Sequence, residues 1–125
     1  MKEAGHGAVV NVSSISGILG EGSCTAYVAS KGAMNAMTLA LARALAPTIR
    51  VNAVCPGMIE TRWHKMRFDE ERYAKFKDDY ERSVPLGIAA TADDIAEAIV
   101  WLIEGARVVT GELLQVDSGW HLGKR

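Results

Sequence analysis

Three short apolar runs, separated by segments that favour helices, constrain the fold of this chain more than any other feature of its sequence. The runs are residues 8–12, 49–54 and 113–116, and the first of them carries three valines. Nearly continuous apolar runs of this length are typical of strands that are buried on both faces, as in a parallel sheet. Segment 26–46, rich in Ala, Leu and Met, and segment 91–105 favour helices between them. We therefore expect an α/β chain of about three parallel strands with flanking helices.

Composition and charge narrow the possible classes of protein. Hydrophobic residues make up 49% of the chain and charged residues 23%, which argues against disorder. Fourteen Lys and Arg stand against fifteen Asp and Glu, so no basic stripe indicates a nucleic acid or an anionic membrane as partner. Residues 33–46, the most apolar stretch, are too few to span a bilayer, and residues 1–7 lack the apolar core of a secretory signal. We expect a cytoplasmic protein without a nucleic-acid or membrane partner.

The 125 residues of the chain suit one domain. Within it, segment 58–84 differs in composition from the rest of the chain. It is dense in charge, and Tyr73, Phe76 and Tyr80 occupy one face of an amphipathic helix. Two interpretations are compatible: a surface helix that packs an aromatic stripe on the core, and a lid over a site. The segment also carries a small basic cluster, which suits a solvated face or, as the sharper alternative, attraction of a carboxylate or phosphate substrate: Arg62, His64, Lys65 and Arg67.

Cysteine and histidine give little indication of chemistry. Two cysteines are too few for a disulfide framework, and both suit small buried side chains in a reducing compartment, although Cys24 falls in a glycine-rich segment, 15–25, expected to be a loop. The three histidines are scattered and no Cys-x-x-Cys occurs, so we expect no metal site.

Ser14, Tyr27 and Lys31 are the candidates for catalysis. Tyr27 and Lys31 lie four residues apart at the start of an expected helix, so their side chains share one face. An ammonium beside a phenol stabilises the phenolate, which suits the tyrosine to exchange a proton. Ser14 follows the first strand, at the edge where open α/β sheets bind ligands, and its hydroxyl can donate to a carbonyl oxygen. The set suits the movement of a proton on and off oxygen while a hydride moves at the adjacent carbon.

The motifs around these residues resemble the short-chain dehydrogenase/reductase family. Twelve residues separate Ser14 from Tyr27 and three separate Tyr27 from Lys31, as in the active-site segment of that family. The similarity covers almost the whole chain apart from 62–84. It is carried by the following segments, in order and at family-like spacing: 10–17, 27–31, 49–57, 59–61, 85–87, 93–96 and 110–117.

The resemblance implies an oxidoreductase that interconverts a small-molecule alcohol and a carbonyl, with NAD or NADP as cofactor. It implies that Tyr27 is the general acid/base, that Lys31 supports it and hydrogen-bonds the nicotinamide ribose, and that Ser14 polarises the substrate oxygen. Residues 58–84 would form the substrate-binding segment. The helix from residue 26 would be half of a dimer-forming pair, which implies a homodimer or homotetramer. Besides Tyr27 and Lys31, the implied cofactor contacts are Pro56, Gly57, Ile59 and Thr61.

Residues 1–125 lack several features of the family's first half. They carry no Gly-rich turn after a strand for the pyrophosphate, no residue that selects NAD or NADP, and no Asn that completes a catalytic tetrad. The resemblance therefore implies one partial domain, the C-terminal half of a Rossmann-like doubly wound parallel sheet, in a truncated member that binds dinucleotide poorly by itself. Two alternatives stay open: a non-catalytic chain that acts as an oligomerisation module, and a dehydratase or epimerase that keeps Tyr27 and Lys31.

Overall fold

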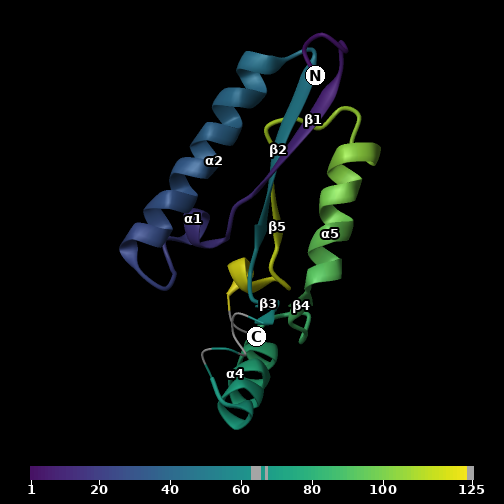
Figure 1. Ribbon diagram of the computed structural model, residues 1–125. Coiled ribbons are helices and arrows are strands. Elements are labelled where there is room, and N and C mark those ends of the chain that lie inside the picture. The colour runs from purple at the N-terminus through teal and green to yellow at the C-terminus, as the bar shows by residue number, and fades with distance from the viewer. Residues whose placement is uncertain (63–65, 67, 124–125) are drawn as a thin grey trace.

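The computed structural model describes residues 1–62, 66 and 68–123 and has an α/β architecture (Figure 1). Three strands form a parallel sheet in the order β1-β2-β5, with α2 on one face and α5 on the other. This arrangement confirms the predicted fold class. The elements are β1 (Gly7–Val12), α1 (Ser16–Leu19), α2 (Thr25–Leu45), β2 (Ile49–Pro56), β3 (Ile59–Glu60), α4 (Glu70–Ser83), β4 (Ala90–Thr91), α5 (Ala92–Val100), a π-helical turn (Trp101–Gly105), β5 (Leu113–Val116) and a 3₁₀ turn (Trp120–Leu122).

The central strand β2 divides the core into two apolar layers. Ile49 and Val51 point to one face and pack with Ala42 of α2. Val54 points to the opposite face and packs with Ile95 of α5 and with Leu102 of the π-helical turn. Because successive side chains of a strand alternate between faces, a strand that is covered on both sides needs apolar residues at nearly every position. The unbroken apolar run in this part of the sequence follows from that requirement.

The local sequence explains where α2 ends and where α5 begins. α2 ends at Leu45, just before Pro47, which cannot continue a helix. At the start of α5, the Thr91 hydroxyl accepts a hydrogen bond from the Asp94 amide at 3.2 Å, and the Asp94 carboxylate accepts one from the Thr91 amide at 2.7 Å. This reciprocal pair is a capping box, and it begins the helix expected in segment 91–105.

Two features of the backbone were not predicted. Segment 15–25 is not a loop throughout, because residues 16–19 form the one-turn helix α1. It lies so close to α2 that a Cβ on Gly17 would stand 2.5 Å from the carbonyl carbon of Lys31. A short parallel ladder, β3–β4, also joins the segment after β2 to the start of α5.

Three further expectations concern the aromatic stripe, the two cysteines and the basic cluster. The predicted helix is present as α4, and none of its residues is fully buried: Tyr73 and Tyr80 are half-buried and Phe76 is 38% exposed. The stripe is therefore only partly covered. Cys55 is buried, as expected, whereas Cys24 is exposed just before α2. In the basic cluster, Arg62 is exposed, and His64, Lys65 and Arg67 lie outside the described residues.

Candidate active site

A cleft of about 730 Å³ opens beyond the carboxyl ends of β1 and β2. It is lined by the segment after β1, the start of α2, the loop after β2, one face of α4 and Trp120. This is the edge at which open α/β sheets bind ligands. The cleft therefore lies where the sequence predicted a site.

Ser14 is held at the floor of this cleft by an extension of the β1–β2 ladder. The Ser13 amide donates to the Val54 carbonyl at 2.8 Å, and the Ile15 amide donates to the Pro56 carbonyl at 3.1 Å. Ser14 itself is 8% exposed, and its hydroxyl oxygen accepts a hydrogen bond from the Ser16 amide at 3.1 Å. Because the hydroxyl is the acceptor in that bond, it keeps its own hydrogen to donate to a ligand.

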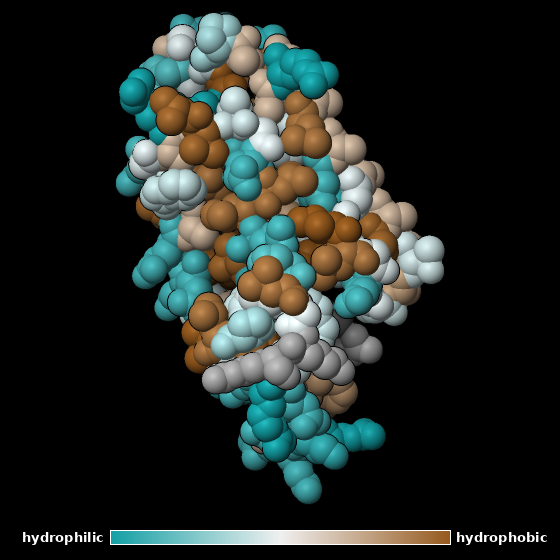
Figure 2. All heavy atoms as spheres, turned by 180° about the vertical axis from the view of Figure 1, so that it is seen from behind, coloured by the Kyte–Doolittle hydropathy of each residue, from teal (hydrophilic) through white to brown (hydrophobic). Residues whose placement is uncertain are grey.

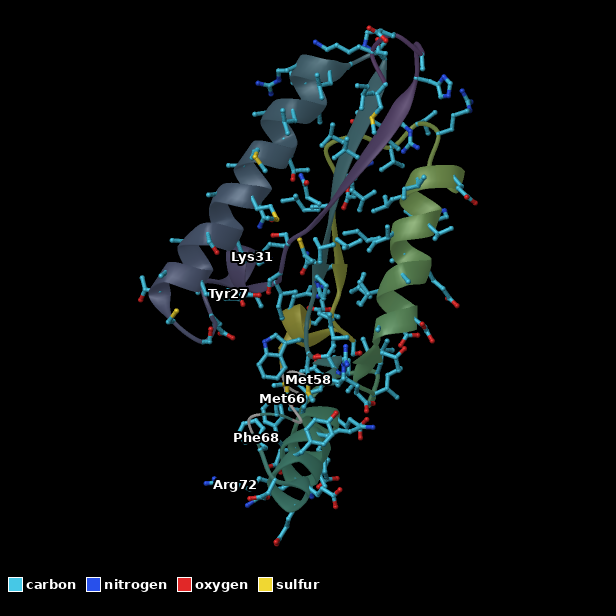
Figure 3. All side chains as sticks on the ribbon, in the orientation of Figure 1. Tyr27, Lys31, Met58, Met66, Phe68 and Arg72 are labelled. Carbon is cyan, nitrogen blue, oxygen red and sulfur yellow. The ribbon has the colours of Figure 1, made fainter. Side chains whose placement is uncertain are left out.

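Tyr27 and Lys31 lie on the same stretch of α2, one turn apart (Figure 3). Tyr27 is 38% exposed and lines the cleft. The Lys31 Nζ lies 5.7 Å from the centre of the Tyr27 ring and donates a hydrogen bond to the Val12 carbonyl at 3.0 Å. The ammonium is thus fixed between the phenol and the end of β1, which confirms that the two side chains share one face.

The cleft brings together four of the seven residues predicted for the site: Ser14, Tyr27, Gly57 and Ile59. The other three stand around it. Lys31 lies over the Tyr27 ring, Pro56 is buried at the end of β2, and Thr61 is half-buried after β3.

A buried polar cluster beneath the site was missed at the level of sequence. The Ser13 hydroxyl donates to the Asn35 side-chain oxygen at 2.6 Å, and the Cys55 thiol lies 3.8 Å from the same oxygen. Burial raises the pKa of the Cys55 thiol. The Asn35 side-chain nitrogen is buried without a hydrogen-bond partner among the described residues. The signal available in the sequence was Asn35 itself, a polar residue inside the most apolar segment of the chain.

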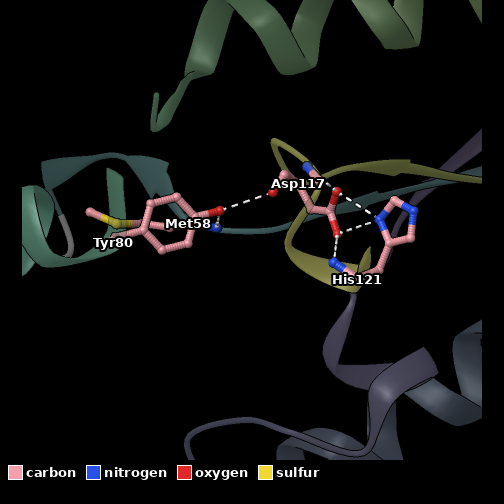
Figure 4. Close-up of polar contacts among 5 residues, drawn as sticks. Met58, Tyr80, Asp117 and His121 are labelled. Atoms are coloured by element: carbon pink, nitrogen blue, oxygen red, sulfur yellow. Dashed lines mark hydrogen bonds and ion pairs between the residues drawn. The ribbon is translucent and has the colours of Figure 1, made fainter. Parts of the chain in front are cut away.

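A second missed group stabilises the turn after β5 (Figure 4). The carboxylate of Asp117, a residue only 3% exposed, accepts hydrogen bonds from the amides of Gly119 and His121, both at 3.0 Å. Its Oδ2 also lies 2.9 Å from His121 Nδ1. These contacts hold the 3₁₀ turn that brings Trp120 to the cleft.

Neither a metal centre nor a membrane span is found in the part of the chain that the structure describes. None of its groups of His, Cys, Asp and Glu side chains has three members placed to hold a metal ion. None of its helices is both long enough and apolar enough to cross a bilayer.

Comparisons with known proteins agree with this geometry. A family model described as "Enoyl-(Acyl carrier protein) reductase" matches residues 1–121. The chain is 44% identical to the short-chain dehydrogenase/reductase homolog YusR of Bacillus subtilis, over 98% of this chain and 89% of that protein. It is 39% identical to the granaticin polyketide synthase putative ketoacyl reductase 2 of Streptomyces violaceoruber, over 98% of this chain and 47% of that protein.

A solved structure shares both the fold and part of the sequence. The chain superposes on ElxO with NADP bound with a TM-score of 0.86 at 31% identity, over 98% of this chain and 49% of that one. YusR is close to this chain in length, but the other curated proteins among the first matches are longer, and the chain spans about half of their length or less. The extent of the matched family model and the close similarity to YusR show that this chain belongs to the short-chain dehydrogenase/reductase family.

Proposed function

We propose that this chain carries the proton-transfer site of an NAD(P)-dependent oxidoreductase that interconverts an alcohol and a carbonyl. One observation carries the proposal: Ser14 and Tyr27 line the same cleft, while the Lys31 Nζ lies 5.7 Å from the Tyr27 ring. A donor, a phenol and a cation gathered at one sheet edge suit proton exchange at a substrate oxygen.

Each of the three residues has a distinct task in this reaction. The Ser14 hydroxyl donates to the substrate oxygen and orients it. The Tyr27 hydroxyl gives a proton to that oxygen during reduction and takes one from it during oxidation. Lys31, held by the Val12 carbonyl, keeps its ammonium beside the phenol ring. The nicotinamide, when bound, supplies or accepts the hydride.

The residues around the cleft fit the nicotinamide and ribose end of such a cofactor. Lys31 offers an ammonium and Thr61 a hydroxyl, both of which can bond ribose or carboxamide groups. Pro56 ends β2, and Gly57 and Ile59, which follow it, line the cleft. We infer that residues 1–125 form the C-terminal half of a Rossmann-like domain, with 58–84 as the substrate segment. In this proposal the residue that selects NAD or NADP is not among residues 1–125.

The intact protein in this proposal is cytoplasmic and forms a homodimer or homotetramer through α2. Met37 and Leu39 of α2 are 46% and 49% exposed, which leaves apolar surface for a second helix. The same surface supports the non-catalytic alternative, in which the chain serves as an oligomerisation module. Light scattering together with cofactor titration separates the two functions, because a module of that kind associates but neither binds NADH or NADPH nor turns over substrate.

Substitution of Tyr27 tests the proposed role directly. In the intact protein, Tyr27→Phe should lower kcat by about 10²- to 10⁴-fold and leave the Kd for NADH or NADPH nearly unchanged, because only the exchangeable proton is lost. Turnover is followed by the absorbance of the reduced cofactor. Trp101→Phe, an aromatic substitution outside both the cleft lining and segment 58–84, is the control and should retain full turnover. Residual turnover within tenfold of wild type in the Tyr27 variant would refute the acid/base role, and turnover without net cofactor oxidation would favour a dehydratase or epimerase.

A further inference from the structure

One wall of the cleft is an aromatic pair that joins α4 to the turn after β5. The rings of Tyr80 and Trp120 are stacked, with their centres 5.5 Å apart and their planes 8° from parallel. Both side chains line the cleft. The two residues come from segments about forty positions apart in the sequence, so the wall exists only in the folded chain.

The Tyr80 hydroxyl fixes this wall to the loop after β2 (Figure 4). It accepts a hydrogen bond from the Met58 amide at 3.4 Å and donates one to the Asp117 carbonyl at 3.2 Å. Burial raises the pKa of Tyr80, so the phenol keeps the hydrogen that it donates. Gly57 allows this approach, since a Cβ there would lie 2.8 Å from the Tyr80 hydroxyl oxygen.

The Trp120 side of the wall is fixed as firmly. The Trp120 amide donates to the Asp117 carbonyl at 3.0 Å, at the start of the 3₁₀ turn. The Asp117 carboxylate in turn accepts bonds from the amides of Gly119 and His121. Trp120 therefore presents its ring from a turn whose backbone is hydrogen-bonded.

The rest of the cleft lining points to a neutral, apolar ligand. Apolar side chains reach it from the segment after β1, the loop after β2 and α4: Ile15, Leu19, Met58, Ile59 and Phe76. Among the described lining residues, Glu21 is the one charged side chain. The described lining offers no cation to bind a carboxylate or a phosphate, whereas flat apolar groups stack well on aromatic rings.

We propose that the Tyr80–Trp120 pair is the specificity-determining wall of this site and selects carbonyl or alcohol substrates that carry a flat apolar group. The Tyr80 hydroxyl is a positioning group, which holds the wall against the loop after β2. This inference rests on the proposed function, because it names the class of substrate that the same site takes.

Ligand binding to the whole chain tests the wall without relying on turnover. The probes are 1-acetonaphthone, a ketone on a flat apolar ring system, and hydroxyacetone, a small polar ketone, each titrated by calorimetry. Wild type should bind 1-acetonaphthone at least tenfold more tightly than hydroxyacetone. Trp120→Ala should weaken binding of 1-acetonaphthone by about tenfold and leave hydroxyacetone unchanged. Trp120→Leu, which keeps apolar volume, should weaken it by a few-fold, and Trp101→Ala, outside the cleft lining, should have no effect.

The positioning role of Tyr80 is tested by removal of its hydroxyl alone. Tyr80→Phe keeps the ring, so it should raise the KM for 1-acetonaphthone by a few-fold, with kcat and the KM for hydroxyacetone nearly unchanged. Trp101→Phe, an aromatic substitution outside both the cleft lining and segment 58–84, is the control. Hydrogen exchange at the Met58 amide should accelerate in the Tyr80 variant and not in the control.

The outcomes separate this inference from the proposed function. If wild type binds 1-acetonaphthone as expected but oxidises no cofactor with it, the proposed reaction fails while the wall stands. If wild type does not prefer 1-acetonaphthone, or if variants that circular dichroism shows to be folded bind it as wild type does, the wall is overturned even where turnover is found.

Discussion

The strand β2 and the helix α4 differ more in burial than any other pair of long elements in this molecule. Seven of the eight residues of β2 are buried, and a strand pairs with it on each side. No residue of α4 is buried. In Figure 2 the α4 end of the molecule is largely hydrophilic, whereas apolar residues lie at the surface across much of the remaining face.

The contrast separates the buried framework from the segment to which we assign substrate recognition. β2 is fixed by the removal of apolar surface from water, a contribution that does not depend on what the cleft holds. α4 is held by a few side-chain contacts, among them the Tyr80 hydroxyl, the Tyr73 hydroxyl near Glu60 and the Lys77–Glu60 ion pair. Changes on α4 can therefore alter the cleft with little loss of stability.

The largest loss of stability is expected from a substitution that leaves a cavity beside β2. Leu102 is fully buried and packs with Val54, so Leu102→Ala should lower the free energy of unfolding by about 2–5 kcal/mol. Phe76→Ala on α4 should cost only about 1 kcal/mol, because 38% of that residue is already exposed. Urea unfolding measures both free-energy losses, provided that the variants have the same m-value as wild type. Equal losses would mean that α4 is as much a part of the core as β2.

A smaller effect is expected at Gly57, where the framework meets α4. A Cβ there would lie 2.9 Å from the Asp117 Cβ and 3.0 Å from its Cα, so backbone has to move. Gly57→Ala should cost about 1–3 kcal/mol, as overpacking generally does. Gly32→Ala, inside α2, is the control: its Cβ would lie 3.8 Å from the Gly17 carbonyl oxygen, so the change should stabilise by about 0.5–1 kcal/mol. If Gly57→Ala were also stabilising, the close contact between the two regions would be absent in solution.

Most of the framework could be predicted from local sequence. The valine run of β1, the proline after α2 and the Thr91–Asp94 box each determine structure through neighbouring residues, so their patterns can be read without knowledge of the fold. The four-residue spacing of Tyr27 and Lys31 likewise predicted that they share a helix face.

The remaining features depend on residues that are distant in the sequence. Asn35 meets Ser13 across 22 positions and Tyr80 meets Trp120 across 40, and no local pattern encodes such pairs. The β3–β4 ladder has only two residues in each strand, which is too short for a period to appear. The aromatic stripe of α4 predicted a helix face but could not show that this face borders a cleft.

The N-terminal cap of α5 tests the framework side of the comparison between β2 and α4, because α5 packs on β2. Thr91→Ala should lower stability by about 1 kcal/mol at neutral pH through loss of the N-cap. The hydrogen bonds from Thr91 lower the pKa of Asp94, so the stabilisation is present above the ordinary pKa of about 3.8 and is lost as the pH falls through the lower folded value.

Unfolding midpoints in urea, measured from pH 7 down to pH 2, test this dependence. The curves of wild type and Thr91→Ala should converge toward the acid end. Glu97→Gln, one turn further along α5 and outside the capping box, should leave the gap between them unchanged. A gap that stays constant with pH would show that the Asp94 carboxylate takes no part in the cap.

The smallest effect is expected for the ion pair between α4 and β3. Lys77 Nζ lies 2.6 Å from a Glu60 carboxylate oxygen, and both side chains keep about a third or a quarter of their surface in water. The hydrogen bond to Glu60 raises the pKa of Lys77, so this stabilisation is present below about pH 10.5 and is lost as the pH rises through the higher folded value. Lys77→Met should therefore cost about 0.2–1 kcal/mol at pH 7 and less in 1 M salt, with Lys75→Met as the exposed control. A salt-independent loss comparable to that of Leu102→Ala would place α4 in the framework, because only a pair shielded from water would resist screening by salt.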